Sequence, residues 1–228
     1  MFAKASQNET VREAVAKVKA SHWAPVILAW VTYAAWAYAI WGAWVPARAV
    51  GNILLGVDMA EAVKFLPAVR GGQIAVPREV FLLPQWTLAL LLSVHAWQPR
   101  WPYPRWIRAA LHLAACMTAL SMLPPPWSPA LLRAPEWRTQ VILIGSALAI
   151  CLTGPLWARL PERWTDAALA GIALVVGGMV GHALQAVWPE FTHVYHHPLT
   201  YGPGVWSLGV GVTALLLFPL LTPRITPQ

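Results

Sequence analysis

Hydrophobic residues in this chain gather in six long runs, separated by shorter segments that hold most of the charged residues and prolines. A helix crosses the hydrocarbon core of a bilayer with about 20 predominantly apolar residues. The runs reach this length or fall slightly short of it. The predicted spans are residues 23–45, 81–97, 106–123, 140–157, 165–188 and 205–222. The pattern therefore predicts an all-α fold, a single polytopic membrane domain with six transmembrane helices.

The leader before the first span, residues 1–22, has a different pattern. Thr10 is followed three residues later by Glu13, the arrangement of a capping box at the start of a helix. Val11, Val15 and Val18 recur at helical spacing, and basic residues lie between them. This pattern predicts an N-terminal amphipathic helix on the cytoplasmic surface of the membrane.

The segment between the first two spans, residues 46–80, contains a second amphipathic pattern. Asp58 and Glu61 share one arc of a helical wheel, and Met59 and Val63 lie on the opposite side. We expect an external helix that lies flat at the membrane interface. A lid or docking helix for a partner and a helix that simply covers the mouth of the bundle both agree with this pattern.

Composition strengthens the membrane assignment. The chain is 58% hydrophobic and only 11% charged, whereas soluble domains carry about 25% charged residues. Its 15 tryptophans are typical of membrane interfaces. The net charge of +7 is therefore interpreted as a signal for topology and for anionic lipid, and nucleic acid is not an expected partner. Cys116 and Cys151 lie inside apolar runs and are expected to be small buried hydrophobic residues.

The basic residues predict an orientation. Cytoplasmic loops are enriched in Lys and Arg, and the short segments "QPRWPYPRW" (98–106) and "ARLPERW" (158–164) follow this rule best. We therefore expect an integral protein of a bacterial-type plasma membrane (a cell inner membrane) with both termini in the cytoplasm. The 46–80 and 189–204 loops are then external.

The predicted spans contain few side chains that could take part in transport, cofactor binding or catalysis. No acidic residue lies near the middle of a span, which argues against a proton- or sodium-coupled transporter. No lysine lies in a span, which argues against a retinal protein. Neither a nucleophilic triad nor a phosphate-binding or dinucleotide-binding motif is found. On its own, the chain is not expected to be an enzyme.

Two histidines offer a possible cofactor site. His95 lies near the inner end of the second span, and His112 lies about two turns into the third span from the same side. Their similar depths are compatible with a b-type haem held between two helices. The alternative is that both are packing or interfacial residues. His95 lies close to the end of its span, which favours this alternative.

A cluster of histidines lies in the stretch "FTHVYHHPLTYGPG" (191–204). His193, His196 and His197 with Glu190 form a candidate site for zinc or copper, because imidazole is a good ligand for both metals. The order HExxH, which couples metal binding to a general base, is absent. We therefore favour the alternative, a structured external loop over residues 189–204.

The fifth span contains a GxxxG pair, Gly177 and Gly181. Small residues at this spacing allow close packing of membrane helices, either within the chain or against another subunit. Taken together, these features predict a non-catalytic integral subunit of a larger membrane complex, which packs against partner subunits and lipid, pigment or quinone. A redox or metal protein that uses the histidines and a permease-type transport subunit are the alternatives.

Overall fold

The computed structural model describes residues 24–46, 53–101, 103–124, 128–157 and 159–221 and is mainly helical. The predicted amphipathic helix of residues 1–22 lies outside the described residues. In chain order the elements are a first helix, Ala24–Trp41; β1, Ala43–Val45; β2, Leu54–Leu55; η2, Gly56–Asp58; α2, Met59–Val63; α3, Pro67–Arg70; η3, Arg78–Leu82; α4, Leu83–Trp97; α5, Arg105–Leu120; α6, Pro129–Leu132; η4, Pro135–Trp137; α7, Arg138–Leu152; α8, Gly154–Trp157; α9, Glu162–Tyr195; and α10, Pro203–Leu221.

Four helical segments among the described residues are long and apolar enough to cross a membrane, and they identify an integral membrane protein. They are Ala24–Trp41, Arg78–Trp97 (η3 with α4), Glu162–Tyr195 (α9) and Pro203–Leu220 in α10. The other two predicted spans correspond to α5, with 16 residues, and α7, with 15. At 1.5 Å per residue these helices are about 24 Å long or less, which is shorter than the roughly 30 Å hydrocarbon core. The prediction of six spans is therefore supported for four of them.

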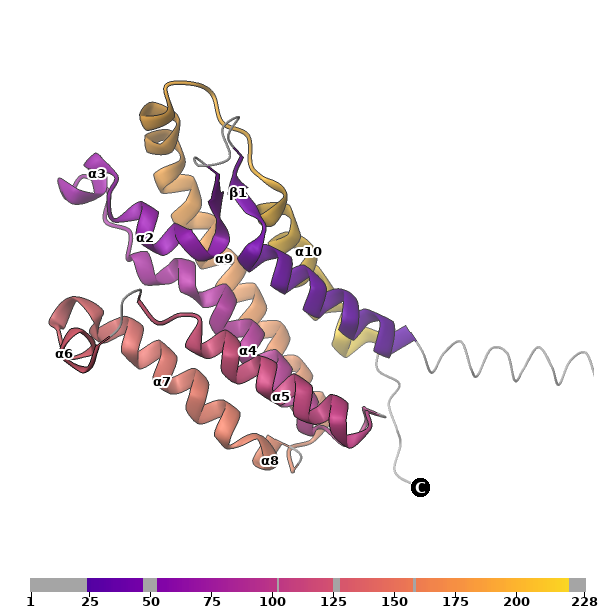
Figure 1. Ribbon diagram of the computed structural model, residues 1–228. Helices are drawn as coiled ribbons and strands as arrows, with labels where there is room; N and C mark the ends of the chain where they lie inside the picture. Colours follow the sequence, from indigo (N-terminus) through magenta and orange to yellow (C-terminus); the bar gives the residue numbers. More distant parts are fainter. Residues whose placement is uncertain (1–23, 47–52, 102, 125–127, 158, 222–228) are drawn as a thin grey trace, which may run out of the picture.

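Helix α4 forms the centre of the bundle (Figure 1) and contacts α5, α7, α8 and α9. Its sequence, "LPQWTLALLLSVHAW", is apolar on all sides, as expected for a helix surrounded by others. In the segment that contains it, 83% of the most apolar 18-residue stretch is buried inside the protein, whereas the same share is 39% for the first helix and for α9. The outer helices therefore turn much of their apolar surface to the surroundings.

The first helix is shorter than predicted, since residues 43–45 form a strand instead of a last helical turn. Strand β1 pairs antiparallel with β2. Gly56 makes this approach possible, because a Cβ at this position would overlap the carbonyl oxygen of Ala39. The Gly202 amide also donates a hydrogen bond of 2.8 Å to the carbonyl of Trp44 and ties the segment before α10 to the hairpin.

Short helices occupy the predicted external segment of residues 46–80. In α2, Met59 and Val63 are fully buried. On the outer side, Glu61 forms ion pairs with Lys64 and Arg78. The guanidinium of Arg78 lies 4.1 Å from the ring centre of Trp137 and so joins this segment to η4. The apolar side of the amphipathic pattern thus packs onto the protein.

Helix α9 is longer than predicted. It continues through Pro189 to Tyr195, so the first residues of the predicted 189–204 loop are helical. A proline inside a helix removes the hydrogen bond to the carbonyl four residues earlier, and its ring crowds that carbonyl, which here belongs to Gln185. The helix nevertheless continues for six residues beyond Pro189. With 34 residues, α9 is about 51 Å long, which exceeds the roughly 30 Å hydrocarbon core.

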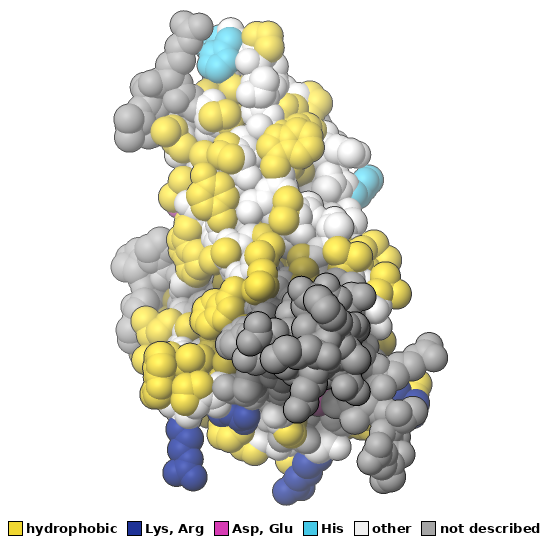
Figure 2. All heavy atoms as spheres, turned by 90° about the vertical axis from the view of Figure 1, so that its right-hand side faces the viewer, with side chains coloured by type: hydrophobic (Ala, Val, Ile, Leu, Met, Phe, Trp, Pro, Cys, Tyr) yellow, Lys and Arg dark blue, Asp and Glu magenta, His cyan; other side chains and the backbone are white. Residues whose placement is uncertain are grey.

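The bundle has two distinct ends. Figure 1 places the connection between α9 and α10 at the end opposite residue 24, where the first helix begins. Figure 2 shows a broad hydrophobic surface, with Lys and Arg side chains at its lower end and His side chains towards its upper part. Apolar side chains that are exposed among the described residues include Ile27, Tyr38 and Trp206. The arrangement agrees with an apolar belt between two polar ends.

Candidate functional site

His95 lies in a closed aromatic environment on α4. Only 1% of its surface is exposed, and its Nδ1 lies 2.7 Å from the hydroxyl of Tyr33 on the first helix. The rings of Trp101 and Phe218 lie 5.0 and 5.5 Å from its ring centre. Its Nε2 atom is buried and has no hydrogen-bond partner in the described part of the chain. The imidazole therefore joins the first helix, α4 and α10.

A buried ion pair lies beside this histidine. The Arg100 guanidinium donates hydrogen bonds of 2.5 and 2.6 Å to the two carboxylate oxygens of Asp166. Asp166 lies at the end of a predicted span, yet it is only 2% exposed. Arg100, which follows α4, folds back onto the start of α9 and supplies the opposite charge.

Further polar contacts hold the α4–α5 connection in place. Gln98 donates a hydrogen bond to the hydroxyl of Thr165, and the Trp101 indole donates one of 3.2 Å to Gln98. Arg108 donates to the carbonyls of Trp101 and Tyr103, each at 3.0 Å. Burial raises the pKa of the Tyr103 phenol above its ordinary value. The whole network links the ends of α4, α5 and α9.

His112 has a different set of neighbours. Its Nδ1 accepts a hydrogen bond of 3.4 Å from the indole of Trp97, and the two rings meet edge to face at 5.9 Å. Residues 95 and 97 are two positions apart on α4 and therefore project from different faces of the helix. His95 faces the first helix and α10, whereas Trp97 packs against Gly154 of α8. The structure does not bring the two predicted haem ligands into one contact.

The histidine cluster lies at the end of α9. His193 and His196 have ring centres 6.3 Å apart, and His197 lies against Tyr195 instead, at 6.2 Å. The Glu190 carboxylate accepts a hydrogen bond of 3.3 Å from the Ala68 amide of α3. Among the described residues, no group of three or more His, Cys, Asp or Glu side chains is placed to hold a metal ion. In this conformation the four predicted ligands do not form one set.

His196 also has a backbone role. It adopts a φ of 55°, in the left-handed region, and caps the C-terminal end of α9. Positions of this kind are usually occupied by glycine or asparagine. The residue thus turns the chain back towards α10.

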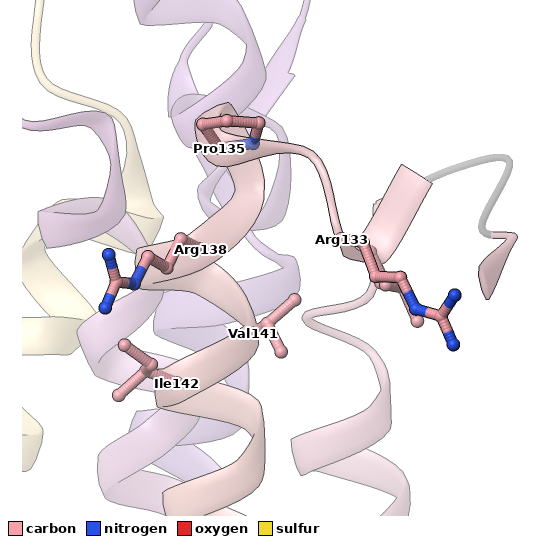
Figure 3. Close-up of a pocket in the computed structure, with 6 residues that line it drawn as sticks. Arg133, Pro135, Arg138, Val141 and Ile142 are labelled. Atoms are coloured by element: carbon pink, nitrogen blue, oxygen red, sulfur yellow. The ribbon is translucent and has the colours of Figure 1, made fainter. Parts of the chain in front are cut away.

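A pocket of about 500 Å³ lies near the start of α7, and Arg133 and Arg138 are among the residues that line it. Figure 3 shows their guanidinium groups pointing away from each other. The two charges therefore do not converge on one ligand.

A larger groove runs between α4, α7 and α9. It consists of two adjoining pockets of about 580 and 400 Å³, which share Trp86, Ala168 and Ile172. Both volumes lie in the range of about 300–1,000 Å³ that is typical of small-molecule sites. Helix α4 contacts both α7 and α9 and forms the floor of the groove. Apart from Ser146 and Thr165, the side chains that line it are apolar.

Comparisons of the chain with protein-family models, with curated proteins and with solved structures find no match. A function for this protein must therefore be inferred from its own geometry.

The groove and the Arg100–Asp166 pair are features that the sequence reasoning missed. The groove residues lie inside uniformly apolar runs, and nothing in those runs distinguishes a groove from a lipid-facing surface. The ion pair did have a signal, because both charged residues fall at span ends on the same predicted side of the membrane.

Proposed function

We propose that this protein is a non-catalytic integral subunit of a larger membrane assembly. It crosses a bacterial-type plasma membrane six times, has both termini in the cytoplasm, and packs against partner subunits through α9. One observation carries this proposal: two polar side chains on the outward face of α9 lie within the predicted span and have no partner among the described residues.

These side chains are His182 and Gln185. Both are exposed, and neither forms a hydrogen bond or an ion pair within the described part of the chain. In hydrocarbon an unsatisfied polar group is costly, so polar residues in membrane helices normally face a partner or a water-filled cavity. A neighbouring subunit that supplies a hydrogen bond accounts for their position.

The same part of α9 also has the small residues that helix association uses. A Cβ added at Gly178 or Gly181 would meet no atom within 4 Å, so both glycines leave open space at the surface. Gly177, by contrast, packs inside the chain, since its added Cβ would lie 2.9 Å from Val212 of α10. Within the GxxxG pair, Gly177 thus makes an internal contact and Gly181 lies on an open face. Small residues with polar neighbours are typical of helix interfaces in membranes.

The arrangement of charge agrees with the proposed orientation. Arg105 and Arg108 begin α5, and Arg163 begins α9, at the end of the bundle where the first helix starts. Cytoplasmic ends of membrane proteins are rich in such residues. In the proposed topology α5 and α7 are also spans, completed by the segments that flank them.

The test is the mass of the particle that is extracted from the native membrane. We expect a particle of fixed composition that is heavier than the 25.0 kDa chain. Gly178→Leu, which fills the open face, should release the chain as a single subunit. Gly209→Leu on α10 is the matched control, since its Cβ also enters open space. A chain extracted alone, or equal effects of both substitutions, would contradict the proposal.

A redox or metal-binding role is the second candidate, because the buried Nε2 of His95 has no partner among the described residues. The same purified sample can be analysed for these groups. They are a haem at His95 or His112, and copper or zinc at His193, His196, His197 and Glu190. A Soret band or a stoichiometric metal content would favour this candidate over the subunit proposal.

A further inference from the structure

Two side chains with hydroxyl groups line the groove between α4, α7 and α9, and both hydroxyls are satisfied within the described part of the chain. The Ser146 hydroxyl donates to the carbonyl of Leu143 at 2.8 Å and accepts a hydrogen bond of 2.9 Å from the Trp86 indole. The Thr165 hydroxyl donates to the carbonyl of Glu162 at 2.8 Å and accepts a hydrogen bond from Gln98. A polar ligand would find no partner there, whereas a hydrocarbon chain would lose nothing by entering.

One end of the groove carries positive charge. Trp164 lines this end, and the guanidinium of Arg163 lies over its ring, 5.7 Å from the ring centre. Arg159 directly precedes Leu160, another lining residue. Both arginines are exposed, and neither forms an ion pair within the described residues. Figure 2 shows that Lys and Arg side chains gather at the lower end of the molecule.

We propose that this groove binds one anionic phospholipid. An acyl chain lies along Trp86, Ala168 and Ile172, and the phosphate contacts Arg159 and Arg163 at the mouth. The inference goes beyond the subunit proposal and rests only on the protein lying in a membrane. Indole side chains at the mouth, such as Trp164, are typical of the depth at which lipid head groups begin.

Charge complementarity selects this occupant. A neutral quinone or pigment would fill the apolar part and leave the two guanidinium groups without a counter-charge. A zwitterionic phospholipid carries an ammonium group beside its phosphate, which weakens the attraction. Basic residues near the membrane surface attract anionic lipid.

The experiment uses the full-length chain, stripped of lipid in detergent, and native mass spectrometry. Phosphatidylglycerol and phosphatidylcholine with identical acyl chains are titrated separately. We expect phosphatidylglycerol to bind roughly tenfold more tightly. Glycerol phosphate, the head group without acyl chains, should not bind measurably. Equal affinity for the two lipids, or a head group that binds as tightly as the whole lipid, would overturn the inference.

Two kinds of variant locate the site. Arg159→Gln with Arg163→Gln should remove the preference for phosphatidylglycerol. Gly171→Leu should lower the binding of both lipids, since it fills the groove from α9 and its Cβ meets no atom within 4 Å. Folding is checked by circular dichroism and elution volume. The arginine variant changes exposed residues only and so remains informative if the groove variant fails to fold.

The matched control is Arg133→Gln with Arg138→Gln, which removes the same charge near the other pocket (Figure 3). This control variant should keep the preference for phosphatidylglycerol. Loss of that preference in the control would contradict the proposed binding site. A quinone or pigment that co-purifies and is displaced by Gly171→Leu would also overturn the proposal. Because the isolated chain is used, a negative result leaves the mass measurement of the assembly unaffected.

Discussion

Asp166 is the residue whose surroundings differ most from what its position in the sequence indicates. It begins a long membrane helix, where a carboxylate can normally reach water. Instead it accepts two hydrogen bonds from Arg100, 66 positions earlier in the chain, and is almost completely buried. A buried carboxylate of this kind is stable only with its partner in place.

Removing one charge of the Arg100–Asp166 pair should therefore destabilise the protein more than removing both charges. Asp166→Asn leaves the Arg100 guanidinium buried without its counter-charge and should cost about 3–5 kcal/mol of stability. The double variant Arg100→Met with Asp166→Leu should recover most of this loss. Thermal unfolding in detergent measures both variants. Equal destabilisation by the single and double variants would show that packing, not charge pairing, governs this site.

His95 shows how far the sequence predicts a site at the scale of residues. Its depth in the second span was predictable from the apolar run, and the packing alternative agrees with its aromatic neighbours. Its partner Tyr33 was not predictable, because the pairing depends on how the first helix crosses α4. The same reason applies to Trp97 and His112. Sequence gives the depth of a polar residue in a membrane helix, but not the direction in which it points.

At the scale of elements, apolar runs predict helices more reliably than they predict where helices end. The run of residues 23–45 is continuous in hydropathy, yet the helix ends at Trp41 and a strand follows. This change depends on Gly56, which is distant in the sequence and lets β2 approach. Pro189 gave the opposite error, because a proline inside a helix can kink it without ending it, and α9 continues to Tyr195.

Gly56 should consequently tolerate no side chain. Gly56→Ala places a Cβ against the carbonyl oxygen of Ala39, and overpacking of this kind costs about 1–3 kcal/mol. Gly145→Ala on α7 is the matched control, since its Cβ enters open space. A glycine inside a helix costs about 0.5–1 kcal/mol relative to alanine, so this control should be slightly stabilising. If the melting temperatures of the two variants shift in the same direction, the close approach of Gly56 to the Ala39 carbonyl would be refuted.

At the scale of the whole molecule, the composition alone indicated lipid as the main solvent of the chain, and four apolar helices agree with it. The number of spans is harder to predict, because α5 and α7 are shorter than the runs that contain them. The groove between α4, α7 and α9 is a property of the assembled bundle. It arises where α7 and α9 each pack on α4, and no single run of residues encodes it.

The starts of α5 and α9 lie at one end of the molecule and the histidine cluster lies at the other, and these ends should lie on opposite sides of the membrane. Labelling of single cysteines with a membrane-impermeant maleimide tests this most directly, after Cys116 and Cys151 are replaced by alanine. His196→Cys should react in intact cells. Arg105→Cys should react only after the membrane is permeabilised. Reaction of Arg105→Cys in intact cells, or equal labelling of both positions there, would contradict a bundle that spans the bilayer in this orientation.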